Sequence, residues 1–166
     1  MKLHQIASAA LLGLYLHAGH AETNTPQSVA RAVADWYIKD GSVGLPHAGD
    51  EPFESSFSNS LLRSMADARA ENDRQEKAYP DSKPAFAETS VVAGIPDTVS
   101  SYRIVRVRQT DKTARVTLDW QLKGTPVVAR TQMLLAPQGA RWVITDILYG
   151  TGHPQQSLSR VLQQRD

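Results

Sequence analysis

The chain has 166 residues, a formal net charge of +1 and no cysteine. Without cysteine it can form neither a disulfide nor a thiolate zinc site, so its stability must come from a hydrophobic core. The small net charge conceals an asymmetry, because residues 22–102 carry 7 Lys and Arg against 13 Asp and Glu, whereas residues 103–166 carry 10 against 4. Such a division concerns surfaces and partners rather than the fold.

The first 21 residues have the pattern of a secretory signal peptide. Lys2 supplies a positive start, an apolar stretch runs from Ile6 to Leu16, and small residues flank His20 at a cleavage site ending in Ala21. The apolar stretch is about half of the roughly 20 residues that cross a bilayer, so we expect no membrane anchor. We therefore predict cleavage after Ala21, a periplasmic or secreted protein, and a single domain over residues 22–166.

The first helix is predicted to begin at Thr25-Pro26, an N-cap hydroxyl followed by a proline at the first helical position. Gly41 is suited to end it. Apolar residues repeat between these points at helical spacing, namely Val29, Ala32, Val33, Trp36 and Tyr37. We expect Trp36 and Tyr37 to pack in the core.

A second helix is predicted to begin at the N-cap Ser58 and to run from Leu61 to about Arg69. The stretch 41–56 before it is rich in Gly, Pro and Ser, which indicates a loop. The charged run 71–84 after it has no apolar period, which predicts a solvated connection. Either a short strand or a helical turn fits residues 85–98.

From Tyr102 onward the apolar period changes from 3.6 to 2, which indicates strands. We expect four of them, at about 102–110, 113–122, 125–135 and 141–149, separated by short turn sequences. Two helices followed by a four-stranded antiparallel meander predict an α+β fold, with the helices packed on one face of a curved sheet.

Short turns fix the register of the strands. A two-residue loop at Asp111-Lys112 would pair Val107 with Val116 and Val105 with Leu118. A two-residue loop at Lys123-Gly124 would pair Trp120 with Val127, and a four-residue loop over 136–139 would pair Met133 with Trp142. The expected core face then comprises Val116, Leu118, Trp120, Val127, Ala129 and Met133.

Asp146 would break this pattern if the last strand continued without interruption. Its carboxylate would enter the core while Ile147 and Tyr149 turned to water, which costs several kcal/mol for the charge and roughly 1.5–3 kcal/mol for each apolar group. A β-bulge at Thr145-Asp146 removes both costs. We therefore predict a bulge, with the carboxylate bonded to nearby backbone N–H groups or facing solvent. The alternative is that Asp146 is a catalytic acid in a cavity.

The opposite, outer face of the sheet collects arginines. The same register places Arg106, Arg108, Arg115, Arg130 and Arg141 on it, with Asp119 among them and the apolar residues Val128, Leu134 and Val143. This face is either an ordinary solvated surface or a docking surface for an acidic protein partner or a second subunit, because arginine mixed with apolar groups suits interfaces.

The residues of the closing strand carry a resemblance to a known family. The strand from Trp142 to Tyr149, the aromatic pair Trp36-Tyr37, the start of the second helix at Ser58, and Leu158 with Leu162 in a short C-terminal helix make the chain similar to the NTF2-like superfamily. Its exported bacterial branch, the DUF3828 proteins of unknown function, is the nearest resemblance. It implies a conical fold with a pocket, but the Asp, His or Tyr residues of the superfamily's enzymes have no counterpart on the core face derived above.

Other site chemistry finds little support in the sequence. After signal cleavage only His47 and His153 remain, both in predicted loops, so we expect no metal, and no cofactor motif is present. Nucleic acid is not an expected partner, because the chain is predicted to be exported and its arginines are not interleaved with aromatic residues.

Three functions fit these observations. The first is an exported, non-enzymatic NTF2-like protein that binds a small apolar ligand or a protein. The second is an envelope inhibitor or immunity-type protein that blocks a toxin or hydrolase. The third is an enzyme that uses Asp146.

Overall fold

The structure, a computed structural model, describes residues 24–40, 44–47, 49–83, 86, 90–96, 98–150 and 155–163. The predicted signal peptide and its cleavage site after Ala21 lie outside these residues, so that prediction stays as it is. The elements in chain order are α1 (Pro26–Asp40), α2 (Phe53–Ser56), α3 (Asn59–Ala78), β1 (Val99–Gln109), β2 (Ala114–Leu122), β3 (Val127–Gln138), β4 (Arg141–Tyr149), β5 (Gln156–Ser157) and α4 (Leu158–Val161).

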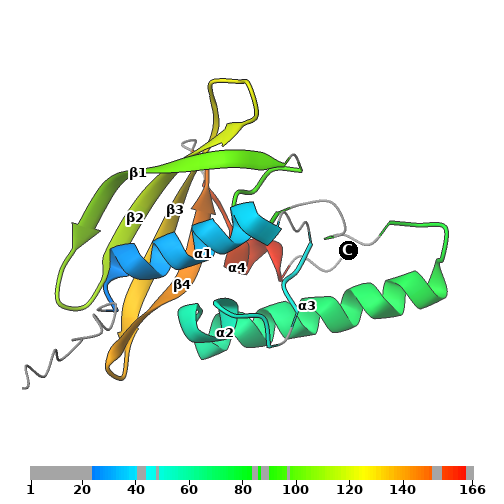
Figure 1. Ribbon diagram of the computed structural model, residues 1–166. Coiled ribbons are helices and arrows are strands. Elements are labelled where there is room, and N and C mark those ends of the chain that lie inside the picture. The colour runs from blue at the N-terminus through cyan, green and yellow to red at the C-terminus, as the bar shows by residue number, and fades with distance from the viewer. Residues whose placement is uncertain are drawn as a thin grey trace, which may run out of the picture.

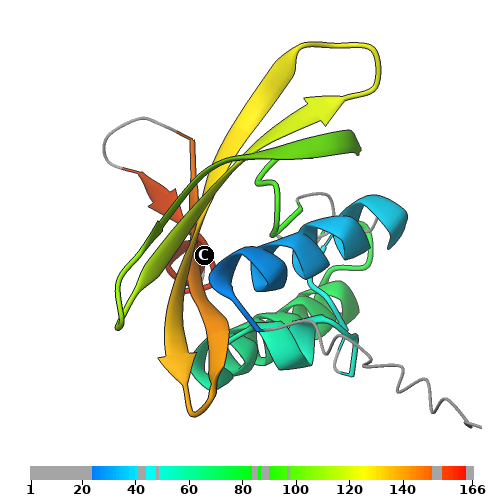
Figure 2. The ribbon, with the colours of Figure 1, turned by 60° about the vertical axis from the view of Figure 1, so that its left-hand side comes forward.

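The strands form one open antiparallel sheet in the order β1-β2-β3-β4-β5. The sheet is strongly twisted, and α1, α2 and α3 lie together on one side of it (Figures 1 and 2). Among these helices, α1 contacts β1, β2 and β4. The predicted α+β class is therefore confirmed, with one short helix, α2, and one two-residue strand, β5, more than the sequence indicated.

Both predicted helix starts are confirmed by their capping bonds. At α1 the backbone N–H of Ser28 donates to Thr25 Oγ1 at 3.1 Å, with Pro26 as the first helical residue. At α3 the N–H of Leu61 donates to Ser58 Oγ at 3.3 Å.

The C-terminal part of α3 corrects the prediction for the charged run. Residues 71–78 are helical and exposed or half-exposed, not an irregular connection. Glu71 pairs with Arg74 one turn later, at 2.6 Å, and the segment consists mainly of good helix formers. A helix that is already nucleated can therefore extend there without an apolar stripe, and it ends before Pro80.

The core lies between α1 and the inner face of the sheet. Val33 and Ala34 of α1 and Leu118, Trp120 and Met133 of the sheet have no exposed surface. The predicted inward face is thus confirmed for Val116, Leu118, Trp120 and Met133; Ala129 is half-buried against the core, and the side chain of Val127 lies outside the described residues.

The strand register agrees with the prediction at the first turn and differs at the next two. Val107 faces Val116 as predicted, but farther along β1 Leu118 faces Ile104 rather than Val105. Trp120, however, faces Ala129 rather than Val127, because residues 123–126 all belong to the second turn. Met133 faces Ile147 rather than Trp142, because the third turn is the tight Gly139-Ala140, β3 continues to Gln138, and β4 has one extra residue before Asp146. The shift at the second turn is by two residues, so it leaves the same side chains facing inward.

The predicted bulge in β4 is confirmed. Leu135 faces Ile144 while the preceding Leu134 faces Asp146, so Thr145 is the extra residue. Beyond it Ile147 is fully buried, and the hydroxyl of Tyr149 donates to the carbonyl of Val91 at 2.7 Å. The phase change thus avoids burial of the Asp146 carboxylate in the core.

Candidate functional site: the arginine face of the sheet

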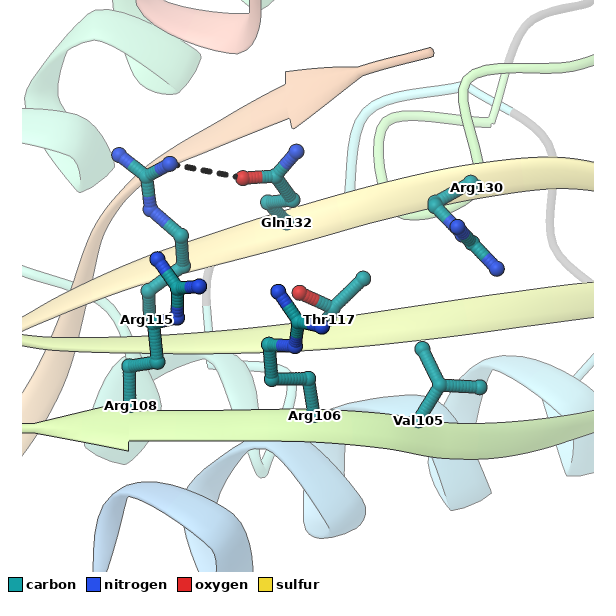
Figure 3. Close-up of a pocket in the computed structure, with 7 residues that line it drawn as sticks. All are labelled: Val105, Arg106, Arg108, Arg115, Thr117, Arg130 and Gln132. Carbon is teal, nitrogen blue, oxygen red and sulfur yellow. Dashed lines mark hydrogen bonds between the residues drawn. The ribbon is translucent and has the colours of Figure 1, made fainter. Parts of the chain in front are cut away.

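Four arginines gather on the side of the sheet that faces away from the helices. Arg106 faces Thr117 and Arg108 faces Arg115 across β1 and β2, while Arg130 lies on β3. We call these four arginines, with Thr117 and Gln132, the arginine face. Together with Val105 they line a depression of about 440 Å³, and Figure 3 shows their side chains rising from three neighbouring strands.

One of the four charges is neutralised within the sheet. Arg130 faces Asp119 directly, and its Nε and Nη2 donate to the two carboxylate oxygens, the latter at 2.8 Å. Asp119 is buried, and Arg103 lies 3.6 Å from it on the other side. The hydrogen bonds from Arg130 hold the pKa of Asp119 below its ordinary value, although burial opposes this. Asp119 is therefore a charged anchor for Arg130.

The other three guanidinium groups have no acidic partner among the residues that the structure describes. Within the described residues no carboxylate lies within 4 Å of Arg106, Arg108 or Arg115. Arg115 is held by a neutral group, since its Nη1 donates to Gln132 Oε1 at 3.0 Å. All three are exposed, so their forked donors remain available to a carboxylate, phosphate or sulfate from outside.

Arg141 does not join this group. It faces Gln138 beside the β3–β4 turn, at the end of the sheet, and it does not line the depression. Of the apolar residues expected among the arginines, Leu134 lies on the outer face as predicted and Val143 does not. Val143 is only 2% exposed and is thus buried, Leu134 is half-buried opposite Arg115, and the side chain of Val128 lies outside the described residues.

Arg103 was missed in the sequence because β1 contains an irregularity. Ile104 faces Leu118 and Arg106 faces Thr117, so Val105 is an extra residue and the strand changes phase there. This phase change turns Ile104 inward and Arg103 to the outer face. The signal was present as two successive apolar residues, Ile104 and Val105, within an otherwise alternating strand.

The carboxylate of Asp146 accepts hydrogen bonds from both β4 and α4. Its Oδ1 accepts the N–H groups of Ile147 at 2.8 Å and Ser159 at 3.0 Å, and its Oδ2 accepts the hydroxyl of Ser159 at 2.7 Å. These bonds tie α4 to the bulge of β4. The position is the one predicted for a bulge residue that bonds to backbone N–H groups.

The described residues contain no group of three His, Cys, Asp or Glu side chains placed to hold a metal ion. His47 is exposed, with its backbone N–H bonded to Asp50 Oδ2 at 2.7 Å, and His153 lies outside the described residues. No helix in the described ranges is both long and apolar enough to span a membrane.

A second, mainly apolar depression lies beside α3. It has a volume of about 220 Å³ and is lined by residues that include Phe53 of α2 and Leu62 and Met65 of α3. Arg69 lies at its edge, and within the described structure the Nη1 of this residue is buried without a hydrogen-bond partner. The inner face of the sheet, by contrast, is filled by Trp120 and its neighbours.

Comparisons with protein-family models, with curated proteins and with solved structures gave no match. The resemblance to NTF2-like proteins thus stays a prediction from the sequence.

Proposed function

We propose that the protein is a non-enzymatic binding protein that recognises an acidic region of a protein partner through its arginine face. The observation that supports this is the presence of three exposed guanidinium groups around one depression, with no carboxylate of the described residues near them. An acidic partner would supply the missing negative charges through paired N–H···O bonds.

The repulsion between two of these arginines also supports the proposal. Arg108 and Arg115 lie directly opposite each other, and like charges in that position destabilise a sheet. An acidic partner would offset this repulsion and would be attracted over a distance before contact. The opposite charge of residues 22–102 does not remove the need for a partner, since their described carboxylates form no ion pair with Arg106, Arg108 or Arg115.

The setting that we propose is the bacterial envelope. The signal-peptide pattern of residues 1–21 favours an exported protein, and the order of two main helices before an antiparallel meander favours an NTF2-like cone. An inhibitor or immunity-type protein that covers a toxin or hydrolase would be one specific form of such a binding protein. The enzyme alternative has less support, because the three donors to Asp146 give its carboxylate a structural role.

A labelled peptide of ten glutamates tests the proposal by fluorescence anisotropy. We expect the full chain to bind it, with an affinity that falls as salt is raised, because exposed charge pairs are screened. Replacing Arg106, Arg108 and Arg115 together by Gln should weaken binding at least about 10-fold, which corresponds to about 1.4 kcal/mol.

A matched control carries the same loss of charge elsewhere. Replacing Arg63, Arg74 and Lys77 of α3 by Gln removes three positive charges from exposed positions and should leave binding almost unchanged. Equal weakening in both triple variants would mean that only net charge matters, and the proposal would then be wrong. Light scattering of the wild type would show whether a second copy is the partner instead.

A further inference from the structure

β1 is an edge strand of the sheet, and it has 11 residues. The free side of an edge strand presents backbone N–H and C=O groups that can pair with another extended segment. Adding a strand to such an edge is a common way of binding a peptide, in which the backbone gives affinity and alternate side chains give specificity. The question is whether the edge of β1 carries features that select a particular segment.

The first turn identifies which backbone groups of β1 are free. The N–H of Thr110 donates to the carbonyl of Thr113 at 2.8 Å, so these residues form a hydrogen-bonded pair. Such pairs alternate with non-bonded ones along an antiparallel ladder. The pair Arg108–Arg115 is thus bonded, and Val107–Val116 is not. The N–H and C=O of Val107 therefore point away from β2, out of the sheet edge.

The side chain of Val107 marks the same place. It is 38% exposed, which makes it one of two large hydrophobic residues exposed in the described part of the chain. It faces the inner side of the sheet, where another depression, of about 370 Å³, lies between β1 and residues Gln27 and Arg31 of α1. An apolar group and free backbone groups thus coincide at one residue.

The two depressions adjoin each other at the edge. The outer one and the inner one share Val105 and Arg106 as lining residues, so they lie on either side of β1. A segment that extended along the edge would place alternate side chains in each depression. On the outer side these side chains would lie beside Arg106 and Arg108, and on the inner side beside Val107.

We propose that the acidic partner contributes an extended segment that pairs with β1 as a sixth strand, with acidic side chains beside Arg106 and Arg108 alternating with apolar side chains beside Val107. The inference rests on the proposed function and adds the form of the partner. Charge complementarity selects this occupant over a second copy of the chain, because antiparallel pairing of two β1 edges would bring arginines next to arginines.

The test uses a labelled nine-residue peptide in which glutamate alternates with valine, added to the full chain. Val107→Pro removes the outward N–H without removing a ladder bond to β2, and proline is tolerated on such an edge. We expect this variant to bind at least about 10-fold more weakly, because it loses a backbone hydrogen bond and the proline ring obstructs the edge. Val107→Thr keeps the N–H and should bind within about threefold of the wild type.

A second probe keeps the test independent of how well the proline variant folds. The same peptide is made with N-methyl groups on alternate residues in each of the two alternations; one of these removes every N–H that points toward β1, and we expect that peptide to lose binding to the wild-type protein. Undiminished binding of the N-methylated peptide in both alternations, or of Val107→Pro in a variant with wild-type circular dichroism, would overturn the strand addition.

The outcomes separate this inference from the proposed function. If the triple variant of Arg106, Arg108 and Arg115 loses the peptide but Val107→Pro keeps it, the partner docks on the arginine face and not on the edge. If the wild type binds neither this peptide nor the glutamate peptide, both proposals are wrong. A dimer seen by light scattering and abolished by Val107→Pro would make a second copy the occupant and would overturn the acidic segment.

Discussion

Arg108 of β1 and Arg115 of β2 face each other across the ladder, with no carboxylate of the described residues within 4 Å of either guanidinium. Arg115 turns toward Gln132 instead, at 3.0 Å. Farther along the same face, beyond Thr117, the buried carboxylate of Asp119 is instead paired with Arg130. The repulsion at Arg108 and Arg115 is therefore a local property of this surface.

We expect Arg108→Thr to stabilise the fold while weakening the binding of the glutamate peptide. Relief of the like-charge pair should raise the free energy of unfolding by about 0.5 kcal/mol, and the gain should shrink at high salt. Urea denaturation at low and high salt measures this difference. Arg103→Thr is the control, since it removes a neighbour of Asp119 and should not stabilise. A loss of stability in Arg108→Thr would mean that the side chain has a structural contact.

Asp119 should make the stability depend on pH in the acid range. Hydrogen bonds from Arg130 lower its folded-state pKa below the unfolded value of about 3.9, so the unfolded chain takes up the proton first. The stabilisation is present above this unfolded value and is lost as the pH falls through the lowered folded pKa. We expect Asp119→Asn to be less stable than the wild type at pH 7 and to lose less stability between pH 7 and 3. Asp111→Asn in the exposed turn is the control, and an equal pH slope in all three proteins would contradict the assignment.

The sequence was sufficient for the inner face of β2 and for the bulge in β4. Period-two alternation placed Leu118 and Trp120 inward, and the turn at Asp111-Lys112 fixed the pairing of Val107 with Val116. The bulge beside Asp146 could be predicted because the uninterrupted strand had a large energetic cost. Binary patterns and turn chemistry act locally, so they remain readable without the rest of the fold.

The register set by the second turn was not predicted correctly. At the second turn the sequence Lys123-Gly124 suggested a two-residue loop, whereas Thr125 and Pro126 also belong to the turn. Pro126 cannot donate to a ladder, so it was a usable sign that pairing starts later. Because the turn is two residues longer than predicted, Asp119 and Arg130 face each other directly across the ladder.

Trp120→Ala should be among the most destabilising single substitutions. Trp120 has no exposed surface, its ring lies edge-on to Tyr37 at 5.7 Å between centroids, and its indole N–H donates to Thr131 Oγ1 at 2.9 Å. We expect a loss of about 3–5 kcal/mol in urea unfolding. Thr131→Val should cost about 1–3 kcal/mol, because it leaves the buried indole N–H unpaired. A loss below about 1 kcal/mol for Trp120→Ala would contradict this account of the core.

Asp146→Asn should lower stability without affecting binding, since the carboxylate holds α4 through Ser159 and does not line the arginine face. We expect a loss of about 1–2 kcal/mol, together with faster hydrogen exchange at the N–H of Ser159. Ser159→Ala removes one donor to the same carboxylate, so the double variant should lose less than the sum of the two single losses. Binding of the glutamate peptide should stay within about twofold of the wild type in all three variants. Loss of binding in an Asp146→Asn variant with native circular dichroism would contradict a purely structural role for this carboxylate.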